Sequence, residues 1–405
     1  MKRSAALAAV SKGSLCAGCG LCEALAPDAV KVRVQEPGYL RPVQTAELER
    51  AQEEAIAETC PGLEVSPWEG RASQVDPYWG PIRECHTGYA KDDEVRFRCS
   101  SGGAISALAI HALEAGLVDL VIHTTADPAN PIGNMTRISR SRGEVLDGAG
   151  SRYAPSSPLR EIMPILEGEE RALFIGKPCD VSALRQLAKF DERVNQRIPY
   201  MLSFFCGGIP SHKGAHDIVE ELGLAARELK RFDYRGNGWP GLTVAETESG
   251  ESAEMTYERS WGKHLSSQVQ FRCKICPDPV GGVADIACAD AWYGGESGYP
   301  QFDEAEGRSL IVARTEAGRA LLRQASSVGA VSTEPLDVRE VDLMQPAQAR
   351  RKRLIWARMK AWQLALRPVP EMAGLKVGEA TRKSPVLALA KEFAGTLRRI
   401  IAGRI

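Results

Sequence analysis

Three cysteines lie three residues apart near the start of the chain, in the stretch CAGCGLC that contains Cys16, Cys19 and Cys22. This CxxCxxC spacing is that of three ligands of a bacterial [4Fe–4S] cluster, whose fourth ligand is a remote cysteine followed by proline. Cys60, in the stretch ETCPG, fits the fourth position. Zinc sites usually combine two CxxC pairs, or one pair with histidines, and the first 85 residues contain no histidine. The four cysteines therefore predict one [4Fe–4S] site, with a zinc knuckle as the alternative.

A second set of cysteines lies in the middle of the chain. Two of them follow expected buried strands at 172–175 and 199–205, and the other two form a CxxC loop followed by proline. Ligands gather at the carboxyl ends of the strands in an open parallel sheet, so cysteines at that edge of two neighbouring strands would meet. Because gathered thiolates favour a soft metal centre, we expect a second [4Fe–4S] cluster, with zinc as the alternative and Cys288 as a substitute ligand. The expected ligands are Cys179, Cys206, Cys273 and Cys276.

A stretch rich in glycine and serine, RCSSGGAISAL, precedes an expected helix at 103–115 and a buried strand at 118–122. The residues before the first helical turn combine hydroxyls, free backbone N–H groups and missing Cβ atoms, which suits an anion such as a pyrophosphate. A plain serine N-cap is the alternative. The residues of this candidate anion site are Ser100, Ser101, Gly102 and Gly103.

Three residues are candidates for proton transfer or substrate contact. Arg235 lies among glycines and aromatic residues in FDYRGNGWPG, where a cation suits an acidic ligand or a stacked ring. His264 precedes the CxxC loop and His212 follows Cys206, and each is a candidate proton donor. The alternatives are a hairpin turn for the arginine loop and structural or surface positions for the histidines. No Ser/His/Asp order or pair of carboxylates indicates hydrolysis.

Several stretches between about residues 95 and 295 resemble the coenzyme F420-reducing hydrogenase/dehydrogenase β-subunit family, and CAGCGLC extends the similarity to members with an added ferredoxin segment. Ala289 stands before Asp290 where members often have glycine. The matching stretches are SSGGAISAL, GSRYAPSS, GKPCDVSALR, FFCGGIPS, YRGNGWPG and CKICPDPVGGVADIACADAW.

The resemblance implies an iron–sulfur flavoprotein that contains FAD. It implies that Ser101, Gly102 and Gly103 help to hold the FAD, and that the stretch GSRY lies near the flavin, with Arg152 where members often have lysine. The cofactor-binding residues that we expect from the matching stretches are Ser100, Ser101, Gly102, Gly103, Ser151, Arg152, Tyr153, Lys177, Asn237 and Trp239.

The expected activity is electron transfer. No GxGxxG follows a first strand, so no nicotinamide site is expected and electrons should arrive singly. We expect a ferredoxin or another one-electron donor to supply electrons that pass through two [4Fe–4S] clusters and FAD to a small organic substrate. The alternative is an electron-transfer subunit of a hydrogenase or dehydrogenase complex, with coenzyme F420 as the acceptor. A non-catalytic zinc-binding module is a third hypothesis.

The bulk composition sets further limits on the class of protein. The chain has 405 residues, a formal net charge of −1 and 44% hydrophobic residues, so its overall charge does not indicate nucleic-acid binding. No apolar run is long enough for a membrane span, and the run AALAAV near the N-terminus is too short for a signal peptide. We therefore expect a cytoplasmic protein.

The expected fold is α/β (α+β) in three parts. These are a ferredoxin-like [4Fe–4S] segment at 1–80, a mixed-sheet α/β core that binds FAD and iron–sulfur at 81–340, and a helical extension at 341–405, with a Pro- and Gly-bearing linker at 61–82. The basic helix expected at 349–362 either docks an acidic ferredoxin or partner subunit, or packs on the body with a solvated basic face. A last amphipathic helix docks on the protein or on a second protomer, which leaves a homo-oligomer open.

Overall fold

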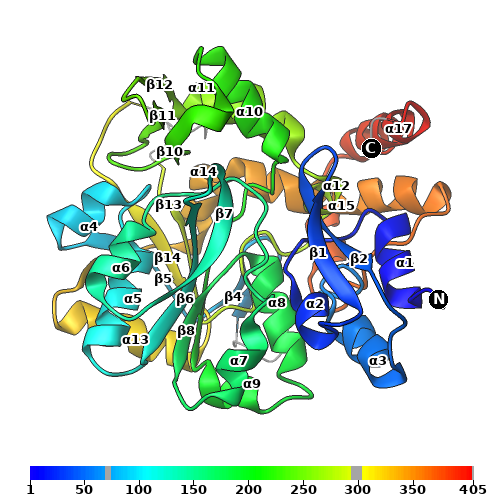
Figure 1. Ribbon diagram of the computed structural model, residues 1–405, viewed down its shortest axis with the longest axis horizontal. Helices are drawn as coiled ribbons and strands as arrows, with labels where there is room; N and C mark the ends of the chain where they lie inside the picture. Colours follow the sequence, from blue (N-terminus) through cyan, green and yellow to red (C-terminus); the bar gives the residue numbers. More distant parts are fainter. Residues whose placement is uncertain (69–73, 293–302, 404–405) are drawn as a thin grey trace.

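An eight-stranded mixed sheet forms the centre of the molecule (Figure 1). The computed structural model describes residues 1–68, 74–292 and 303–403. The central strands β13, β9, β8 and β6 run parallel, whereas β7 at one edge and β14, β5 and β15 at the other pair antiparallel. The expected mixed α/β fold is confirmed. The strand order is β15 (Val331–Pro335), β5 (Glu84–Ala90), β14 (Ser309–Ala313), β13 (Ile286–Asp290), β9 (Tyr200–Phe204), β8 (Ala172–Ile175), β6 (Leu120–Asp127) and β7 (Asn130–Ser139).

Helices cover both faces of this sheet because successive side chains of a strand point to opposite faces. In β8, Leu173 packs into one helical layer and Phe174 into the other. The helices on the Leu173 side are α5 (Ala104–Glu114), α6 (Arg142–Asp147) and α13 (Glu316–Ser327). Those on the Phe174 side are α7 (Ile162–Glu167), α8 (Pro178–Leu187) and α9 (Arg193–Arg197), while α4 (Asp93–Arg98) lies beside β5.

Strands β8 and β9 are parallel neighbours, so their carboxyl ends meet at one edge of the sheet, as expected. Cys206 lies two residues beyond the end of β9. Cys179 lies in the first turn of α8, not in the turn before it, because Pro178 occupies the first helical position and its fixed φ favours a helix start there. The expected strands and helices of this region are otherwise present within a few residues.

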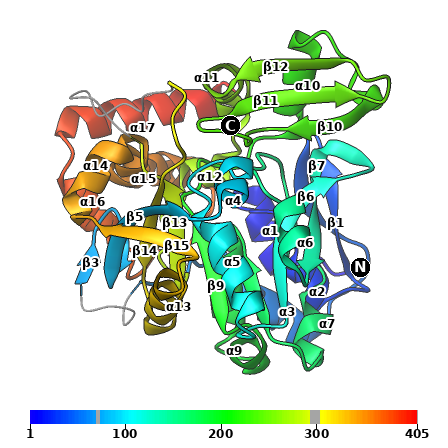
Figure 2. The ribbon, with the colours of Figure 1, turned by 90° about the vertical axis from the view of Figure 1, so that its left-hand side faces the viewer.

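A smaller three-stranded antiparallel sheet covers this carboxyl edge (Figure 2). Its contact with the large sheet includes an ion pair between Arg235, which follows β10, and Asp290, the last residue of β13. The elements of this layer are β10 (Leu229–Asp233), β11 (Leu242–Thr247), β12 (Ser252–Thr256), α10 (His212–Glu221), η1 (Ala226–Glu228), α11 (Tyr257–Arg259), the π-helix η2 (Ser260–Leu265) and η3 (Ser266–Gln268).

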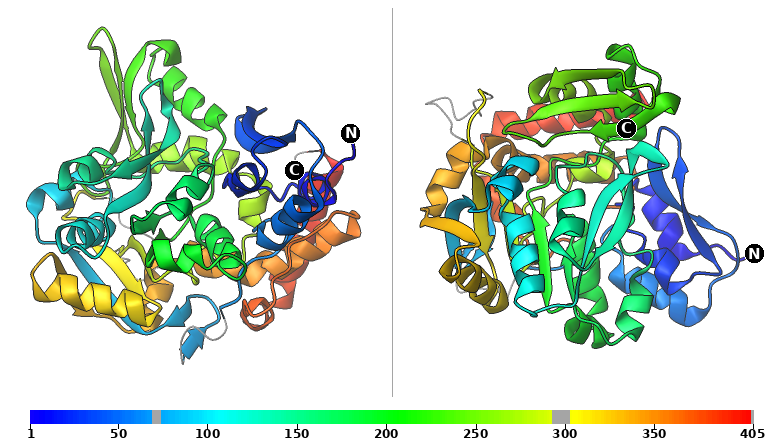
Figure 3. Two further views of the ribbon diagram at one scale, coloured as in Figure 1. Left: turned by 60° about the horizontal axis from the view of Figure 1, so that its bottom comes forward. Right: turned by 60° about the vertical axis from the view of Figure 1, so that its left-hand side comes forward.

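The N-terminal segment and the C-terminal helices lie side by side, although they are at opposite ends of the sequence (Figures 1 and 3). Val10 and Leu15 share one buried cluster with Phe271, Ile275 and Trp362. The N-terminal elements are α1 (Ala5–Lys12), α2 (Leu21–Leu25), β1 (Val30–Gln35), β2 (Tyr39–Gln44) and α3 (Arg50–Thr59). The others are α12 (Phe271–Lys274), η4 (Val338–Glu340), α14 (Val341–Met344), α15 (Pro346–Leu364), α16 (Val377–Arg382) and α17 (Val386–Ile401).

The expected helical extension is present in α14 to α17. Its longest helix, α15, carries a dense run of basic residues, and α17 packs on it. Across the described parts of the chain, no helix combines the length and the apolar character that crossing a membrane requires.

The segment expected to be a linker at 61–82 is packed where the structure describes it. Trp68 and Trp79 are both buried, and Trp79 stacks on Phe205 with 5.9 Å between the ring centroids. A short hairpin of β3 (Gln74–Asp76) and β4 (Gly80–Ile82) follows. The expectation of a plain linker was wrong because proline and glycine content marks turns, while the two large aromatic side chains gain free energy by burial.

Candidate functional site

The first cysteine set gathers in the N-terminal segment. Its loop wraps tightly because Gly18 and Gly20 have φ angles of +77° and +91°, which residues with a Cβ atom rarely adopt. The thiols lie close enough for their charges to interact. Burial is the largest cause that raises the pKa of Cys22, and the charges of the other three thiols add to it. The structure brings together Cys16, Cys19, Cys22 and Cys60.

The second cysteine set gathers at the carboxyl edge of the large sheet. Burial raises the pKa of Cys206 to about 12, and the charges of Cys273 and Cys276 act in the same direction. The thiol of Cys179, which is partly exposed, lies near those of Cys206 and Cys273. The substitute Cys288 is not part of this set, because its side chain packs in the core on the α5 and α13 side of the sheet.

Backbone N–H groups point at seven of these eight thiols, and this pattern fits a metal cluster. A neutral thiol is a weak hydrogen-bond acceptor, whereas cluster-bound thiolates accept such bonds, which tune the cluster. The donor and acceptor pairs are Gly18 to Cys16, Leu21 to Cys19, Glu23 to Cys22, Gly62 and Leu63 to Cys60, Gly208 to Cys206, Ile209 to Cys273 and Asp278 to Cys276.

A single metal ion fits less well. Among the described residues, no three Cys, His, Asp or Glu side chains are close enough to coordinate one ion together. The ligands of a [4Fe–4S] cluster bind four different iron atoms and therefore lie farther apart than the ligands of one ion.

Lys177 lies between the two sets, beside Cys179 in sequence and near Cys19 in space. Its ammonium group donates to Ser156 Oγ at 2.6 Å and pairs with Asp180 at 2.8 Å, and all three side chains are buried. It lies near thiols of both cysteine sets, and the flavin-binding role expected for it stays a prediction.

The C-terminal helix α15 closes over the second cysteine set. Three of its cations donate hydrogen bonds to backbone carbonyls of the segments that carry the ligands. Of the basic residues of α15, Arg350 and Lys360 are exposed. The helix was expected to present its cations to solvent or to a partner, and this holds only in part. The three inward cations instead donate to carbonyls that the cysteine turns leave unpaired. The pairs are Arg351 with Cys206 and Gly207, Lys352 with Pro277, and Arg358 with Lys274.

Three glycine-rich stretches converge beside the second cysteine set. The hydroxyls of Ser100 and Ser151 lie 2.5 Å apart, and the backbone N–H of Ser151 donates to the carbonyl of Arg235 at 3.1 Å. A Cβ atom on Gly150 would lie 2.8 Å from that carbonyl oxygen, so only glycine allows the approach. The loops expected to contact a flavin therefore meet at one place.

A buried ion pair organises this place. Arg235 is 2% exposed and donates to both carboxylate oxygens of Asp290, at 2.8 and 2.7 Å. The Trp239 indole N–H donates to the same carboxylate at 2.8 Å, and its ring stacks on Trp292 with 4.8 Å between centroids. Because Asp290 and the carbonyl of Pro240 occupy the guanidinium of Arg235, its role is to hold the loop, which differs from the expected substrate contact.

Aromatic rings gather between the small sheet and the second cysteine set. Tyr153 lies 5.0 Å from Trp261 and 6.2 Å from Tyr257, measured between ring centroids. Trp261 lies directly over Gly207, where a Cβ atom would be 2.7 Å from the indole ring. Rings gathered in this way beside Cys206 suit a planar ring system such as a flavin.

Residues of the candidate anion site make contacts within the protein. The Ser101 hydroxyl donates to the carbonyl of Arg308 at 3.1 Å. A Cβ atom on Gly102 would lie 2.6 Å from the backbone nitrogen of Ser309, and Gly103 has φ +74°. Gly102 is needed for close packing against β14, and Gly103 for close packing against α4 and for its positive φ, so both would remain necessary without an anion.

Arg152 also has an internal role. Its guanidinium donates to the carbonyls of Pro131, Gly133 and Phe232 at 2.6 to 2.7 Å and to Asn134 Oδ1 at 3.0 Å. These contacts occupy the donors that were expected to pair with a phosphate or the flavin ring.

Neither candidate proton donor lies in the aromatic region. His264 Nε2 is 2.9 Å from the carboxylate of Glu221, on α10. His212 contacts the hairpin of β1 and β2, where its backbone N–H donates to the carbonyl of Gly38 at 3.1 Å. Asn237, a further expected cofactor contact, is exposed on its loop.

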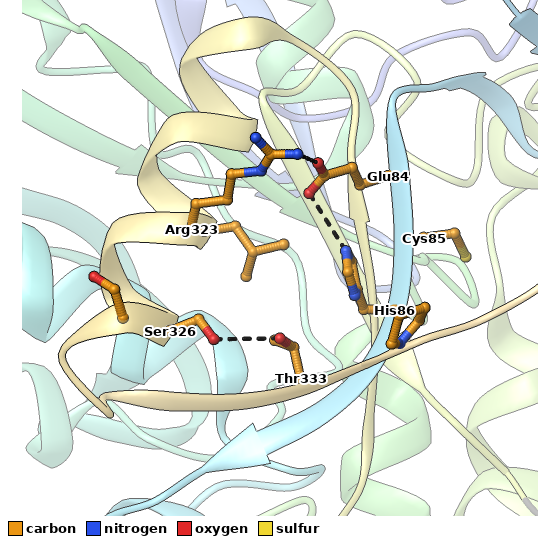
Figure 4. A pocket seen from close by; sticks show the side chains of 9 residues that line it. Glu84, Cys85, His86, Arg323, Ser326 and Thr333 are labelled. Atoms are coloured by element: carbon orange, nitrogen blue, oxygen red, sulfur yellow. Dashed lines mark hydrogen bonds and ion pairs between the residues drawn. The ribbon is translucent and has the colours of Figure 1, made fainter.

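A pocket of about 580 Å³ lies elsewhere, between β5, α13 and β15 (Figure 4). Glu84 pairs there with Arg323 and with His86, whereas Cys85 lies on the other side of the strand. None of the expected site residues lines this pocket, so it is separate from the candidate site.

Sequence reasoning missed Asp290, Asp180 and the inward cations of α15. A signal existed for Asp290, since it ends a strand at the ligand-bearing edge of a parallel sheet. No sequence pattern predicted the contacts of Arg351 and Lys352, because a series of basic residues on a helix does not indicate which carbonyl groups will lie within hydrogen-bond distance.

Residues 85–163 match the family model described as coenzyme F420 hydrogenase/dehydrogenase, beta subunit N-term, and residues 169–339 match the companion model for the carboxyl-terminal part of the same beta subunit. The first cysteine set up to Cys60 and helices α14 to α17 lie outside the matched residues.

Individual relatives agree with the family models. The coenzyme F420 hydrogenase subunit beta of Methanococcus voltae is 26% identical, over 68% of this chain and 92% of that protein. The chloroplastic 7-hydroxymethyl chlorophyll a reductase of Oryza sativa subsp. japonica is 24% identical, over 54% of this chain and 45% of that protein. A chain of the F420-reducing [NiFe] hydrogenase complex from Methanosarcina barkeri shares the fold, with a TM-score of 0.55, 20% identity and coverage of 74% of this chain and 99% of that chain.

Proposed function

The chain belongs to the coenzyme F420 hydrogenase/dehydrogenase beta subunit family, and on that premise we propose that it is an iron–sulfur flavoprotein oxidoreductase. In this proposal it takes electrons from a ferredoxin or another one-electron donor and delivers them to a small organic substrate. Iron–sulfur clusters carry single electrons, and a flavin joins such steps into a two-electron reduction.

The observation that carries the proposal is the convergence of two separate sets of cysteines. The second set joins residues more than ninety positions apart in the chain, and backbone N–H groups of both sets point at the thiols. Thiolates gathered in this way are ligands of choice for a soft metal centre.

The residues around the two sets have distinct parts in this proposal. Cys16, Cys19, Cys22 and Cys60 hold the first [4Fe–4S] cluster, and Cys179, Cys206, Cys273 and Cys276 hold the second. The aromatic region around Tyr153, Trp261 and Trp292 holds the FAD ring and excludes water from it, while the ion pair of Arg235 and Asp290 keeps the loops of that region in place.

A second candidate function is favoured by the length of the similarity. The chain covers 92% of the beta subunit of a coenzyme F420 hydrogenase, so an electron-transfer subunit that reduces or oxidises coenzyme F420 within a larger complex is the alternative. Purification of the native protein distinguishes the two candidates. A stoichiometric hydrogenase or dehydrogenase subunit together with coenzyme F420 reduction supports the alternative, and a catalytically competent single chain supports the reductase.

The test of cofactor content is anaerobic purification followed by iron, sulfide, zinc and flavin analysis. We expect about eight iron atoms and about eight sulfides per chain from two four-iron clusters, together with about one FAD. Cys22→Ser should lower the iron content to about four atoms by removing the first cluster only.

The matched control is Cys85→Ser, because Cys85 belongs to neither set and its replacement should leave the iron content unchanged. Zinc in place of iron, together with an absence of flavin, would reject the oxidoreductase proposal.

A further inference from the structure

Arg272 connects the two cysteine sets. It lies in α12 directly before Cys273, and its side chain is 3% exposed. Its Nη2 donates to the carbonyl oxygen of Pro61 at 2.7 Å, and Pro61 follows Cys60 in the chain. The side chain therefore spans from the helix that carries a ligand of the second set to the turn that carries a ligand of the first.

The charge of Arg272 has no protein counter-charge in the described part of the chain. No described carboxylate lies within ion-pair distance, and the buried Nε has no hydrogen-bond partner there. Two other buried cations of this region, Lys177 and Arg235, do have carboxylate partners, in Asp180 and Asp290. A buried, unpaired guanidinium carries a large free-energy cost, so a negative group should lie beside it.

The thiols of both sets are the groups that its charge reaches. The guanidinium of Arg272 lies near the thiols of Cys16, Cys60 and Cys276. Cys16 and Cys60 belong to the first set, and Cys276 belongs to the second. Lys177 also lies near thiols of both sets, but Asp180 neutralises it.

We propose that Arg272 is a shared counter-ion of two iron–sulfur clusters and raises the reduction potentials of both. This inference rests on the proposed function, because it requires a cluster in each set. Reduction adds one electron, and hence one negative charge, to a cluster, and a nearby fixed cation stabilises that charge. One cation between two clusters moves both potentials in the same direction, so both become easier to reduce while the difference between them changes little.

Two other arginines provide matched controls, because each approaches one set only. Arg41 donates to the carbonyl of Cys16 at 3.4 Å, and its charge acts on that thiol. Arg351 donates to the carbonyl of Cys206 at 3.0 Å, and its charge acts on that thiol. Arg41→Gln should therefore shift the potential of the first cluster alone, and Arg351→Gln that of the second alone.

The test is a potentiometric titration of the purified full-length protein, followed by electron paramagnetic resonance. Iron content is measured first in every variant, and the Cys22→Ser protein identifies the signal of the second cluster. We expect Arg272→Gln to shift both midpoint potentials to more negative values. Arg272→Lys should shift both by less, because it keeps the charge while losing the fixed guanidinium geometry.

The outcomes separate this inference from the proposed function. Wild-type protein without two clusters rejects the proposed function and the inference with it. With both clusters present, a shift of one potential alone, or of neither, in Arg272→Gln overturns the inference and leaves the proposed function standing. If the glutamine variant does not assemble its clusters, the lysine variant decides, since a shift confined to one cluster there also overturns the shared role.

Discussion

At the scale of single residues, the buried charges explain why several expected site residues have structural roles. A guanidinium that leaves water must replace its hydration with fixed acceptors. Arg152 finds backbone carbonyls, and Arg235 finds both oxygens of Asp290. Both arginines are therefore held inside the fold by their own acceptors, and the roles expected for them at a cofactor or substrate stay predictions.

The Arg235–Asp290 pair yields the first prediction. Asp290→Asn leaves Arg235 buried without a compensating charge, and we expect a loss of about 3–5 kcal/mol in the free energy of unfolding. The measurement is chemical denaturation of the holoprotein at neutral pH.

The control for this prediction is the double variant Asp290→Asn with Arg235→Gln, which removes both charges and should recover part of the loss. A cost below about 1 kcal/mol for the single variant would contradict a tightly coupled buried pair.

At the scale of elements, α15 acts as a cover over the second cysteine set. Cysteine turns leave carbonyl groups without backbone partners, and a helix rich in long cations can reach them. The stacked rings of Phe271 and Trp362, with 3.7 Å between centroids, join α15 to α12, the helix that carries Cys273. The position of a cysteine ligand therefore depends on a helix far away in the sequence.

This contact yields the second prediction. Trp362→Ala should lower stability by about 3–5 kcal/mol, because it removes a fully buried ring. It should also speed the loss of iron from the second set in air, since α12 loses its support. The measurements are thermal unfolding and the decay of cluster absorbance.

Trp356 is the matched control on the same helix, because its ring is 42% exposed. Trp356→Ala should change stability by less than about 0.5 kcal/mol. Equal effects of the two substitutions would show that the Phe271 contact does not support α12.

At the scale of the whole molecule, the N-terminal segment is joined to the core by more than the chain itself. The carbonyl of Cys19 accepts a hydrogen bond from Leu159 at 2.9 Å, and Ser157 donates to the carbonyl of Gly18 at 2.8 Å. The apolar cluster that contains Leu15 and Trp362 adds a C-terminal contact. The division at 1–80, 81–340 and 341–405 stays a prediction, and these contacts argue that its first part does not fold alone.

The third prediction concerns hydrogen exchange in the intact holoprotein. Amides of α3 should show the same opening free energy as those of α8, because their helices pack together and open only when the core does. Amides of α17 serve as the internal control and should exchange earlier, because Thr396 is the one buried residue recorded in that helix. Exchange of α3 at an opening free energy similar to that of α17 would show that the N-terminal segment opens independently.

The sequence by itself determined the parts whose signals are local. The spacing of Cys16, Cys19 and Cys22, the helix now seen as α5 and the strand β8 follow from patterns that a few neighbouring residues contain. The adjacency of Cys179 and Cys206 was also predictable, because the carboxyl ends of parallel neighbours share an edge.

The partner of each long polar side chain, by contrast, depends on how distant elements pack together. Asp290 as the partner of Arg235, Asp180 as the partner of Lys177, and the position of Arg272 between the cysteine sets all join residues from distant parts of the chain. The physical reason is that burial makes an unpaired charge costly, while the sequence does not state which acceptor lies within reach once the elements have packed.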